Sequence, residues 1–346
     1  MKRLCIMGAG SMGMVLGAYI SKAGRQVDLI DANKAHVDAM NEKGAHVVGF
    51  SDFIVPVTAL TPDQMEGIYD IVFIMTKQTY NESVFASIKA HTNEDSIIVT
   101  LQNGIPELEC AKVFGTKHLL GAPISWGATW LEPGVSKITS PDNLPHDQGG
   151  REFLLGSVTG EITEDVKEVK EILELMCWTE VSENIMSIRW TKLWINATFS
   201  GMSAVIGGTF GDVIDVPSAL RAVTFIGRET VRAAHASGVQ LFNMTRGLEI
   251  NTLLDFDPEE KRKSLEPVYA QLFNGARALK ASMFQDPEKG LKTEVDAING
   301  VVCSVGRQYG VPTPACDLVV KNVHEYEAKK CVGTFEAAKQ FDSLEV

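Results

Sequence analysis

The chain has 346 residues, 45% apolar and 22% charged, which is ordinary for a folded globular protein of two domains. Its formal net charge of −12 excludes nucleic acid and anionic membranes as expected main partners, because both are negatively charged. The six cysteines lack CxxC spacing, and the histidines lack metal-ligand spacing, so we expect neither a disulfide framework nor a metal site. With no signal-peptide pattern and no window long enough for a membrane helix, a cytoplasmic location is expected.

A glycine-rich turn between a predicted strand and a predicted helix is the most informative motif. The strand Lys2–Met7 runs into Gly8-Ala9-Gly10-Ser11-Met12-Gly13, and the helix covers Ser11–Ala23. Gly8 permits the tight turn, Gly10 lets a pyrophosphate approach the backbone, and Gly13 lets helix and strand pack closely. The N–H groups of the helix N-terminus would bind the phosphates. We therefore predict that these six residues bind a dinucleotide, with a ligand-free glycine turn as the less favoured alternative.

Asp31 ends the second predicted strand, Gln26–Asp31, and is expected to select the cofactor. A carboxylate there accepts hydrogen bonds from the adenosine ribose hydroxyls and repels a 2′-phosphate. Lys34 opens the next predicted helix, Lys34–Lys43, and would offset part of that repulsion. The sequence thus predicts that NAD(H) is preferred over NADP(H), and a helix-capping role for Asp31 stays open beside it.

Strands and helices alternate through the rest of the first half. Two nearly continuous apolar runs, Tyr69–Thr76 and Ser96–Leu101, indicate central parallel strands, with a helix over Asn81–His91 between them. The remaining expected elements are mixed short strands at 47–55, a strand at His118–Ala122, antiparallel strands within Trp126–Ile138, a loop at 139–150, a strand at Phe153–Val158 and a helix at Thr163–Met176. This βαβ alternation predicts an α/β Rossmann domain over residues 1–183, doubly wound around a mostly parallel sheet.

From about Glu183 only helical patterns follow, so residues 184–346 are predicted to form an all-helical substrate and catalytic domain. The expected helices are Ser187–Ile206, Val216–Ser237, Pro258–Lys280, Glu294–Tyr309 and Pro314–Lys329. The charged run Glu259–Lys263 is expected to be a solvated helix face.

A dinucleotide domain joined to a helical domain suggests hydride transfer, for which the protein must supply a proton. Lys192, Asn196 and Ser200 are spaced i, i+4 and i+8, which places them on one face of a regular helix. A solvent-facing polar stripe is the alternative interpretation. Thr293 is a plausible helix cap, with Glu294 in the first turn, where its charge is favoured.

At this point the chain resembles the ketopantoate reductase (2-dehydropantoate 2-reductase) family over essentially its whole length. The matching pieces are GAGSMG at 8–13, TK at 76–77, QNG at 102–104, KLWIN at 192–196, GDVIDVP at 211–217 and the segment 282–314. The resemblance implies a Rossmann domain followed by an all-α domain like that of 6-phosphogluconate dehydrogenase. It implies reduction of a small-molecule 2-keto acid, most simply ketopantoate to D-pantoate, by a homodimer.

The resemblance also implies roles for individual residues. Lys192 matches the general acid, which protonates the keto oxygen, and Glu294 matches the acidic residue that helps to position substrate and lysine. Asn196 and Ser282 match side chains that hydrogen-bond the substrate. Asn103 matches an asparagine at the boundary of cofactor and substrate, and Lys77 matches a lysine beside the cofactor.

Three departures from the family keep other functions open. Many members use NADP(H) and carry a basic residue where this chain has Asp31, and Ser200 stands where a further substrate-binding asparagine is expected. The stretch Leu241–Lys280 is longer than usual and could add a helix near the site or at an oligomer contact. The alternatives are an NAD-dependent D-2-hydroxy acid dehydrogenase for branched or aromatic 2-keto acids and, more remotely, a non-catalytic NAD(H)-sensing module.

Overall fold

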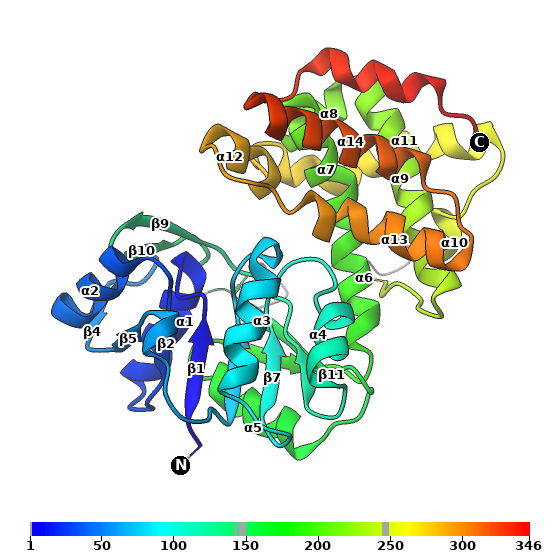
Figure 1. Ribbon diagram of the computed structural model, residues 1–346. Helices are drawn as coiled ribbons and strands as arrows, with labels where there is room; N and C mark the ends of the chain where they lie inside the picture. Colours follow the sequence, from blue (N-terminus) through cyan, green and yellow to red (C-terminus); the bar gives the residue numbers. More distant parts are fainter. Residues whose placement is uncertain (1, 142–143, 145–149, 244–248) are drawn as a thin grey trace. The chain divides into compact units, whose positions relative to one another are not determined.

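The computed structural model describes residues 2–141, 144, 150–243 and 249–346, and it divides the chain into two compact units (Figure 1). The first unit comprises Met1–Gln102 and Pro106–Ile185, and the second comprises Asn103–Ile105 and Met186–Val346. Most of the predicted loop at 139–150, and part of the long stretch at 241–280, lie outside the described residues.

The first unit is built on an eight-stranded sheet in the order β12-β11-β8-β7-β6-β1-β2-β5. The strands are β1 (Leu4–Met7), β2 (Asp28–Ile30), β5 (Thr58–Leu60), β6 (Ile71–Ile74), β7 (Ile97–Thr100), β8 (Leu119–Gly121), β11 (Glu152–Ser157) and β12 (Trp178–Val181). All neighbours pair in parallel except β8 and β11, which are antiparallel. The predicted doubly wound, mostly parallel sheet is confirmed.

Helices cover both faces of this sheet, as the alternation of side chains along β1 shows. Leu4 and Ile6 pack in one apolar core with α1 (Ser11–Lys22) and α5 (Glu164–Leu173). Cys5 and Met7 point to the other face and pack with α3 (Asn81–Ala90) and α4 (Glu107–Phe114). Because both faces of the central strands are buried, these strands are apolar throughout.

A second, four-stranded sheet lies against α1. Its order is β4-β3-β10-β9, from β3 (Ala45–Gly49), β4 (Phe53–Val55), β9 (Ala128–Glu132) and β10 (Val135–Ile138). The antiparallel pair β9 and β10 was predicted, whereas the parallel pairing of β3 with β10 was not. The helix α2 (Lys34–Lys43) connects β2 to this sheet and contacts β3.

Among the described residues of the second unit, all the regular elements are helices, as predicted (Figure 1). Its α-helices are α6 (Ile185–Ile195), α7 (Gly201–Ile206), α8 (Phe210–Asp215), α9 (Pro217–Ala236), α10 (Ile250–Leu253), α11 (Glu259–Phe273), α12 (Ser282–Glu288), α13 (Asn299–Tyr309) and α14 (Pro314–Lys329). The long helix α9 is largely buried and contacts α8, α11, α13 and α14, so it forms the centre of the unit. Among the helices described in either unit, none has both the length and the apolarity that crossing a bilayer requires.

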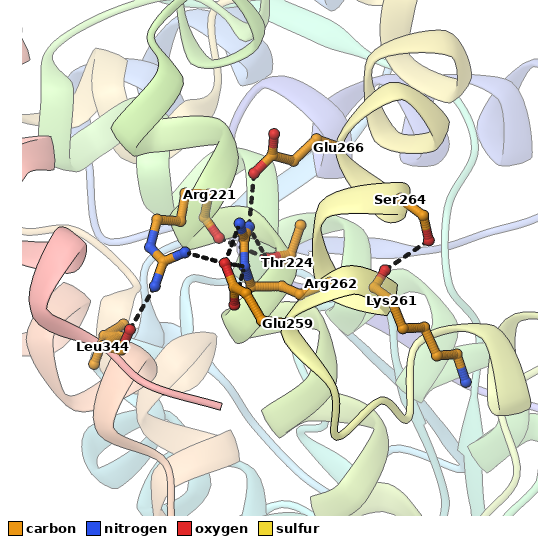
Figure 2. Close-up of polar contacts among 8 residues, drawn as sticks. All are labelled: Arg221, Thr224, Glu259, Lys261, Arg262, Ser264, Glu266 and Leu344. Carbon is orange, nitrogen blue, oxygen red and sulfur yellow. Dashed lines mark hydrogen bonds and ion pairs between the residues drawn. The ribbon is translucent and has the colours of Figure 1, made fainter.

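A network of charged side chains docks α11 onto α9, as Figure 2 shows. Arg262 is only 2% exposed, and it donates to both carboxylate oxygens of Glu259 and to Glu266. Arg221 of α9 donates to Glu259 at 2.9 Å and to the carbonyl of Leu344 at 2.6 Å. The hydrogen bonds from Arg262 lower the pKa of Glu259 to about 2. The expected solvated face at 259–263 is therefore wrong for Arg262, because this guanidinium is buried by its ion pairs.

Candidate active site

The turn between β1 and α1 has the geometry that its glycines predict. Gly8 has φ +98°, and a Cβ atom there would lie 2.6 Å from the backbone nitrogen of Thr76. A Cβ on Gly13 would lie 2.1 Å from the carbonyl oxygen of Gly8. In contrast, no heavy atom lies within 4 Å of the Cβ position of Gly10, which leaves the N-terminus of α1 open on that side. This open cradle fits a pyrophosphate, for which the first N–H groups of a helix are natural donors.

The candidate cofactor residues follow the carboxyl ends of four strands that are neighbours in the sheet. The segment Gly8–Gly13 follows β1, Asp31 follows β2, Lys77 follows β6, and Asn103 follows β7. The chain runs outward from β1 to β2 and β5, and then returns to place β6 on the other side of β1. Ligands of open α/β sheets collect at such a switch point. Of these residues, Asn103 is part of the second unit.

Asp31 is not the cap of the following helix. Asn33 caps α2, because its side chain accepts a hydrogen bond from the N–H of His36 at 3.3 Å. One carboxylate oxygen of Asp31 accepts from the N–H of Asn33 at 2.9 Å. Lys34 pairs with Asp38, one turn further along α2, at 2.7 Å. Because the ammonium of Lys34 is directed toward Asp38, it offsets less of the repulsion between Asp31 and a 2′-phosphate than expected.

Two polar side chains that the sequence analysis did not single out brace the loops around this edge. Gln102 Nε2 donates to the carbonyl of Thr76 at 2.9 Å and to Asn81 Oδ1 at 2.8 Å. The buried ring of His36 hydrogen-bonds the carbonyl of Ala9 through Nε2 at 2.9 Å and accepts from the N–H of Gly134 at Nδ1. The QNG match pointed to Gln102, whereas nothing in the local sequence indicated that His36 reaches the glycine turn.

In the second unit, Lys192 of α6 is half-buried and close to the charge of Glu294. Burial lowers the pKa of Lys192 from 10.5 to about 8; Arg189 adds to this lowering and Glu294 opposes it. Arg189 lies one turn before Lys192 and is fully buried, which is rare for a guanidinium. Its i, i+3 spacing from Lys192 was the only signal in the sequence, and the analysis missed it.

Glu294 is 7% exposed and precedes a single 3₁₀ turn, Val295–Ala297, rather than opening a long helix. Thr293 Oγ1 accepts from the N–H of Val295 at 3.3 Å, but the N-cap of that turn is Glu294, so the cap expected at Thr293 lies one residue further along the chain. Thr293 is itself held by Glu327 of α14, which accepts from its N–H and its hydroxyl at 2.8 and 2.7 Å. The predicted helix Glu294–Tyr309 is therefore wrong at its start, because α13 begins only at Asn299.

The helix that carries Lys192 is interrupted by a π turn. After α6 ends at Ile195, the segment Asn196–Ser200 is π-helical, and the N–H of Gly201 donates to the carbonyl of Asn196, five residues back. The helix predicted over Ser187–Ile206 is present as α6, the π segment and α7, but the regular i, i+4, i+8 spacing is wrong, because a π turn contains more residues than an α turn. Ser200 is 8% exposed, which excludes a fully solvent-facing stripe.

Ser282 is the first residue of α12 and is exposed. The helix α12 contacts both the π segment and α7, so Ser282 belongs to the same region of the second unit as Asn196 and Ser200. The second unit thus brings Lys192 and Glu294 together and places the other three predicted substrate residues on elements that contact one another.

The titration of Lys192 gives a testable pH dependence. A general acid must carry its proton, so we expect kcat/KM for reduction of a keto acid to be constant below about pH 8 and to fall about tenfold per pH unit above it. The reverse oxidation needs the neutral amine and should rise through the same pKa. Steady-state rates in both directions measure this. The Glu294→Gln variant should lower the pKa, because it removes the charge that favours the ammonium. A reduction profile that bends only near the ordinary lysine pKa of 10.5 would contradict the assignment.

Comparisons with known proteins agree with the two-part architecture. A family model described as "Ketopantoate reductase PanE/ApbA" matches residues 4–145, and one described as "Ketopantoate reductase PanE/ApbA C terminal" matches residues 184–327. Among curated proteins, the chain is 27% identical to a 2-dehydropantoate 2-reductase of Streptococcus pyogenes serotype M3, covering 93% of this chain and 97% of the relative. It is 25% identical to the 2-dehydropantoate 2-reductase of Pyrococcus horikoshii, covering 90% and 93%.

Solved structures show the same fold. A ketopantoate reductase of this family from Ralstonia eutropha JMP134 superposes with a TM-score of 0.78 at 21% identity, covering 95% of this chain and 99% of that one. D-Mandelate dehydrogenase in a ternary complex with NADH and anilino(oxo)acetate gives 0.77 at 23% identity with the same coverage. A dimeric ketopantoate reductase from Staphylococcus aureus gives 0.70 at 15% identity, again covering 95% and 99%.

Proposed function

The chain belongs to the ketopantoate reductase family, and from that premise we propose that it reduces the keto group of 2-dehydropantoate to D-pantoate. The observation that carries the proposal is that the half-buried Lys192 lies close to the charge of the buried Glu294 in the helical unit. Burial and the neighbouring Arg189 lower the pKa of Lys192 to about 8, and a proton donor works best with a pKa near the working pH.

The proposed chemistry divides between cofactor and protein. When bound, the reduced nicotinamide supplies the hydride that adds to the keto carbon. The Lys192 ammonium donates a hydrogen bond to the keto oxygen and transfers its proton there as negative charge develops. Glu294 favours the protonated form of Lys192. We assign Asn196, Ser200 and Ser282 to the hydroxyl and carboxylate of the substrate.

We assign the cofactor to the segment 8–13, with Lys77 and Asn103 beside the nicotinamide half and Asp31 at the adenosine ribose. The open side of Gly10 supports the pyrophosphate site. NAD(H) is proposed as the preferred cofactor, because the carboxylate of Asp31 would repel a 2′-phosphate and the next lysine in the sequence, Lys34, is paired with Asp38.

Initial rates of ketopantoate reduction with NADH and, separately, with NADPH test both proposals. We expect efficient turnover with NADH and a higher KM for NADPH. Efficient turnover with NADPH alone would retain the reaction and refute the assignment of Asp31. The Asp31→Ser variant is the matched check on that residue: it should lower KM for NADPH while leaving KM for ketopantoate unchanged.

A D-2-hydroxy acid dehydrogenase for branched or aromatic 2-keto acids is the second candidate. It is favoured by Ser200, whose side chain is shorter than the expected asparagine and leaves more room beside the substrate. Poor turnover of ketopantoate together with rapid oxidation of NADH by another 2-keto acid would establish it. Cofactor binding without turnover on any 2-keto acid would instead support a sensing module.

A homodimer is proposed as the assembly, and the molar mass in solution at working concentration tests it.

A further inference from the structure

The π segment that follows Lys192 is held from α13 by one buried asparagine. Asn299, the first residue of α13, is fully buried, and its Nδ2 donates to the carbonyl of Ala197 at 3.0 Å. A π turn interrupts the regular hydrogen-bond ladder of a helix, so carbonyls within it need other donors. Asn299 supplies one of them from a helix that is more than a hundred residues away in sequence.

The contact between Asn299 and the π segment is also tight. A Cβ on Gly201 would lie 2.7 Å from Asn299 Oδ1 and 3.1 Å from its Nδ2, so the missing side chain of Gly201 makes room for the amide. Among the described residues, Oδ1 has no hydrogen-bond partner, which leaves it facing the backbone of Gly201. The far side of the segment is fixed as well, because the ring of Phe199 stacks on Phe273 of α11 at 3.9 Å between centroids.

Asn299 connects the chain segment that follows Glu294 with the π segment that follows Lys192. It is five residues after Glu294, with only the short turn Val295–Ala297 between them. The carbonyl that it binds, Ala197, directly follows Asn196 and lies five residues after Lys192. One side chain therefore joins the segment that follows the carboxylate to the π segment that follows the helix of the ammonium.

We propose that Asn299 is a positioning residue: it ties the π segment to α13 and so holds Lys192 and Asn196 in register with Glu294. The inference rests on the proposed roles of Lys192 and Glu294 and extends them to a residue that touches neither substrate nor cofactor. Without the hydrogen bond from Asn299, the charge of Glu294 favours the ammonium form of Lys192 less, and the side chain of Asn196 is no longer held in one orientation. The cofactor residues of the other unit are unaffected.

The Asn299→Leu variant removes the donor and keeps the branched shape of the side chain. The first readout needs no substrate: the pKa of Lys192 is measured from the pH dependence of its labelling by acetic anhydride, followed by mass spectrometry. We expect a lower pKa than in the wild type, in the direction of the Glu294→Gln variant, because the opposing influence of Glu294 weakens. In the Glu294→Gln background, Asn299→Leu should cause no further shift.

The second readout is turnover of ketopantoate. Misplaced groups in a site cost about tenfold to a hundredfold in rate, so kcat should fall by that much while KM for the cofactor stays unchanged. Asn322→Leu is the matched control, because Asn322 is 3% exposed and its Nδ2 likewise donates to a helix carbonyl, that of Leu318, at 2.8 Å. It should leave both the pKa of Lys192 and kcat unchanged.

An unchanged or raised pKa of Lys192 in Asn299→Leu, or an equal loss of kcat in Asn322→Leu, would overturn the proposal. If Asn299→Leu does not fold, Gly201→Ala pushes on the same contact from the opposite side and should give the same two results, although alanine is the better helix former. A wild-type protein without turnover on ketopantoate refutes the proposed substrate, and the labelling result still decides the role of Asn299.

Discussion

Replacing Lys192 by alanine is expected to lower kcat for keto-acid reduction by about 10²–10⁴-fold, the usual contribution of a general acid. The keto oxygen would then gain its negative charge without a proton donor beside it. Arg189 cannot replace the lysine, because a guanidinium does not give up its proton in this pH range. The variant should still fold, since Lys192 is only half-buried and its ammonium is costly to bury.

Steady-state kinetics of Lys192→Ala should be accompanied by the thermal unfolding midpoint and the Kd of the cofactor. Both should stay close to the wild type, because the assigned cofactor residues, all but Asn103, lie in the first unit and none of them is altered. Lys263→Ala, on an exposed position of α11 in the same unit, is the matched control and should be fully active. A Lys192→Ala variant with near-normal kcat would show that another group supplies the proton.

The parts of the fold that could be predicted are those whose signals are local. Apolar runs identified the central strands, and the glycine turn with its flanking strand and helix identified the cofactor loop. The helix Pro314–Lys329 was predicted with its observed bounds, because a proline opens it and its apolar spacing is regular. The parallel pairing of β3 with β10 could not be predicted, since it joins residues such as His46 and Val135, which are far apart in the chain.

In the candidate site, too, features with a local sequence signal could be predicted and features that depend on distant contacts could not. The pairing of Lys192 with Glu294 followed from the family resemblance, not from spacing, because the two residues come from distant elements. The π turn at 196–200 depends on tertiary contacts with Asn299 and Phe273, which no local pattern records. Arg262 looked like a surface charge, because the acidic partners that let it be buried are visible only once α11 packs on α9.

Two glycines of the β1–α1 turn are expected to differ in how the same added methyl group affects the stability of the protein. At Gly13 the Cβ would lie 2.1 Å from the carbonyl oxygen of Gly8, a backbone atom that cannot move alone. Overpacking of this kind costs about 1–3 kcal/mol, so Gly13→Ala should lower the free energy of unfolding and displace the phosphate-binding turn. Cofactor binding should weaken with it.

Gly10→Ala should leave the unliganded protein as stable as the wild type, because no heavy atom lies within 4 Å of its Cβ position and its φ of −62° suits alanine. A small loss from a poorer helix cap is offset by the lower entropy of the unfolded chain. The pyrophosphate, however, would meet the methyl group. We therefore expect the Kd of NADH to rise about 5–150-fold, the equivalent of about 1–3 kcal/mol of overpacking.

Thermal unfolding without cofactor, and titration of NADH by fluorescence, separate the two effects. The expected pattern is lower stability with weaker binding for Gly13→Ala, and weaker binding alone for Gly10→Ala. Unchanged NADH affinity in Gly10→Ala would mean that no phosphate approaches this turn, and the open side of Gly10 would then be a packing gap. A Gly10→Ala protein that is itself destabilised would show instead that the glycine serves the fold. Because the added group is the same in both variants, the difference between them reports only what faces each glycine.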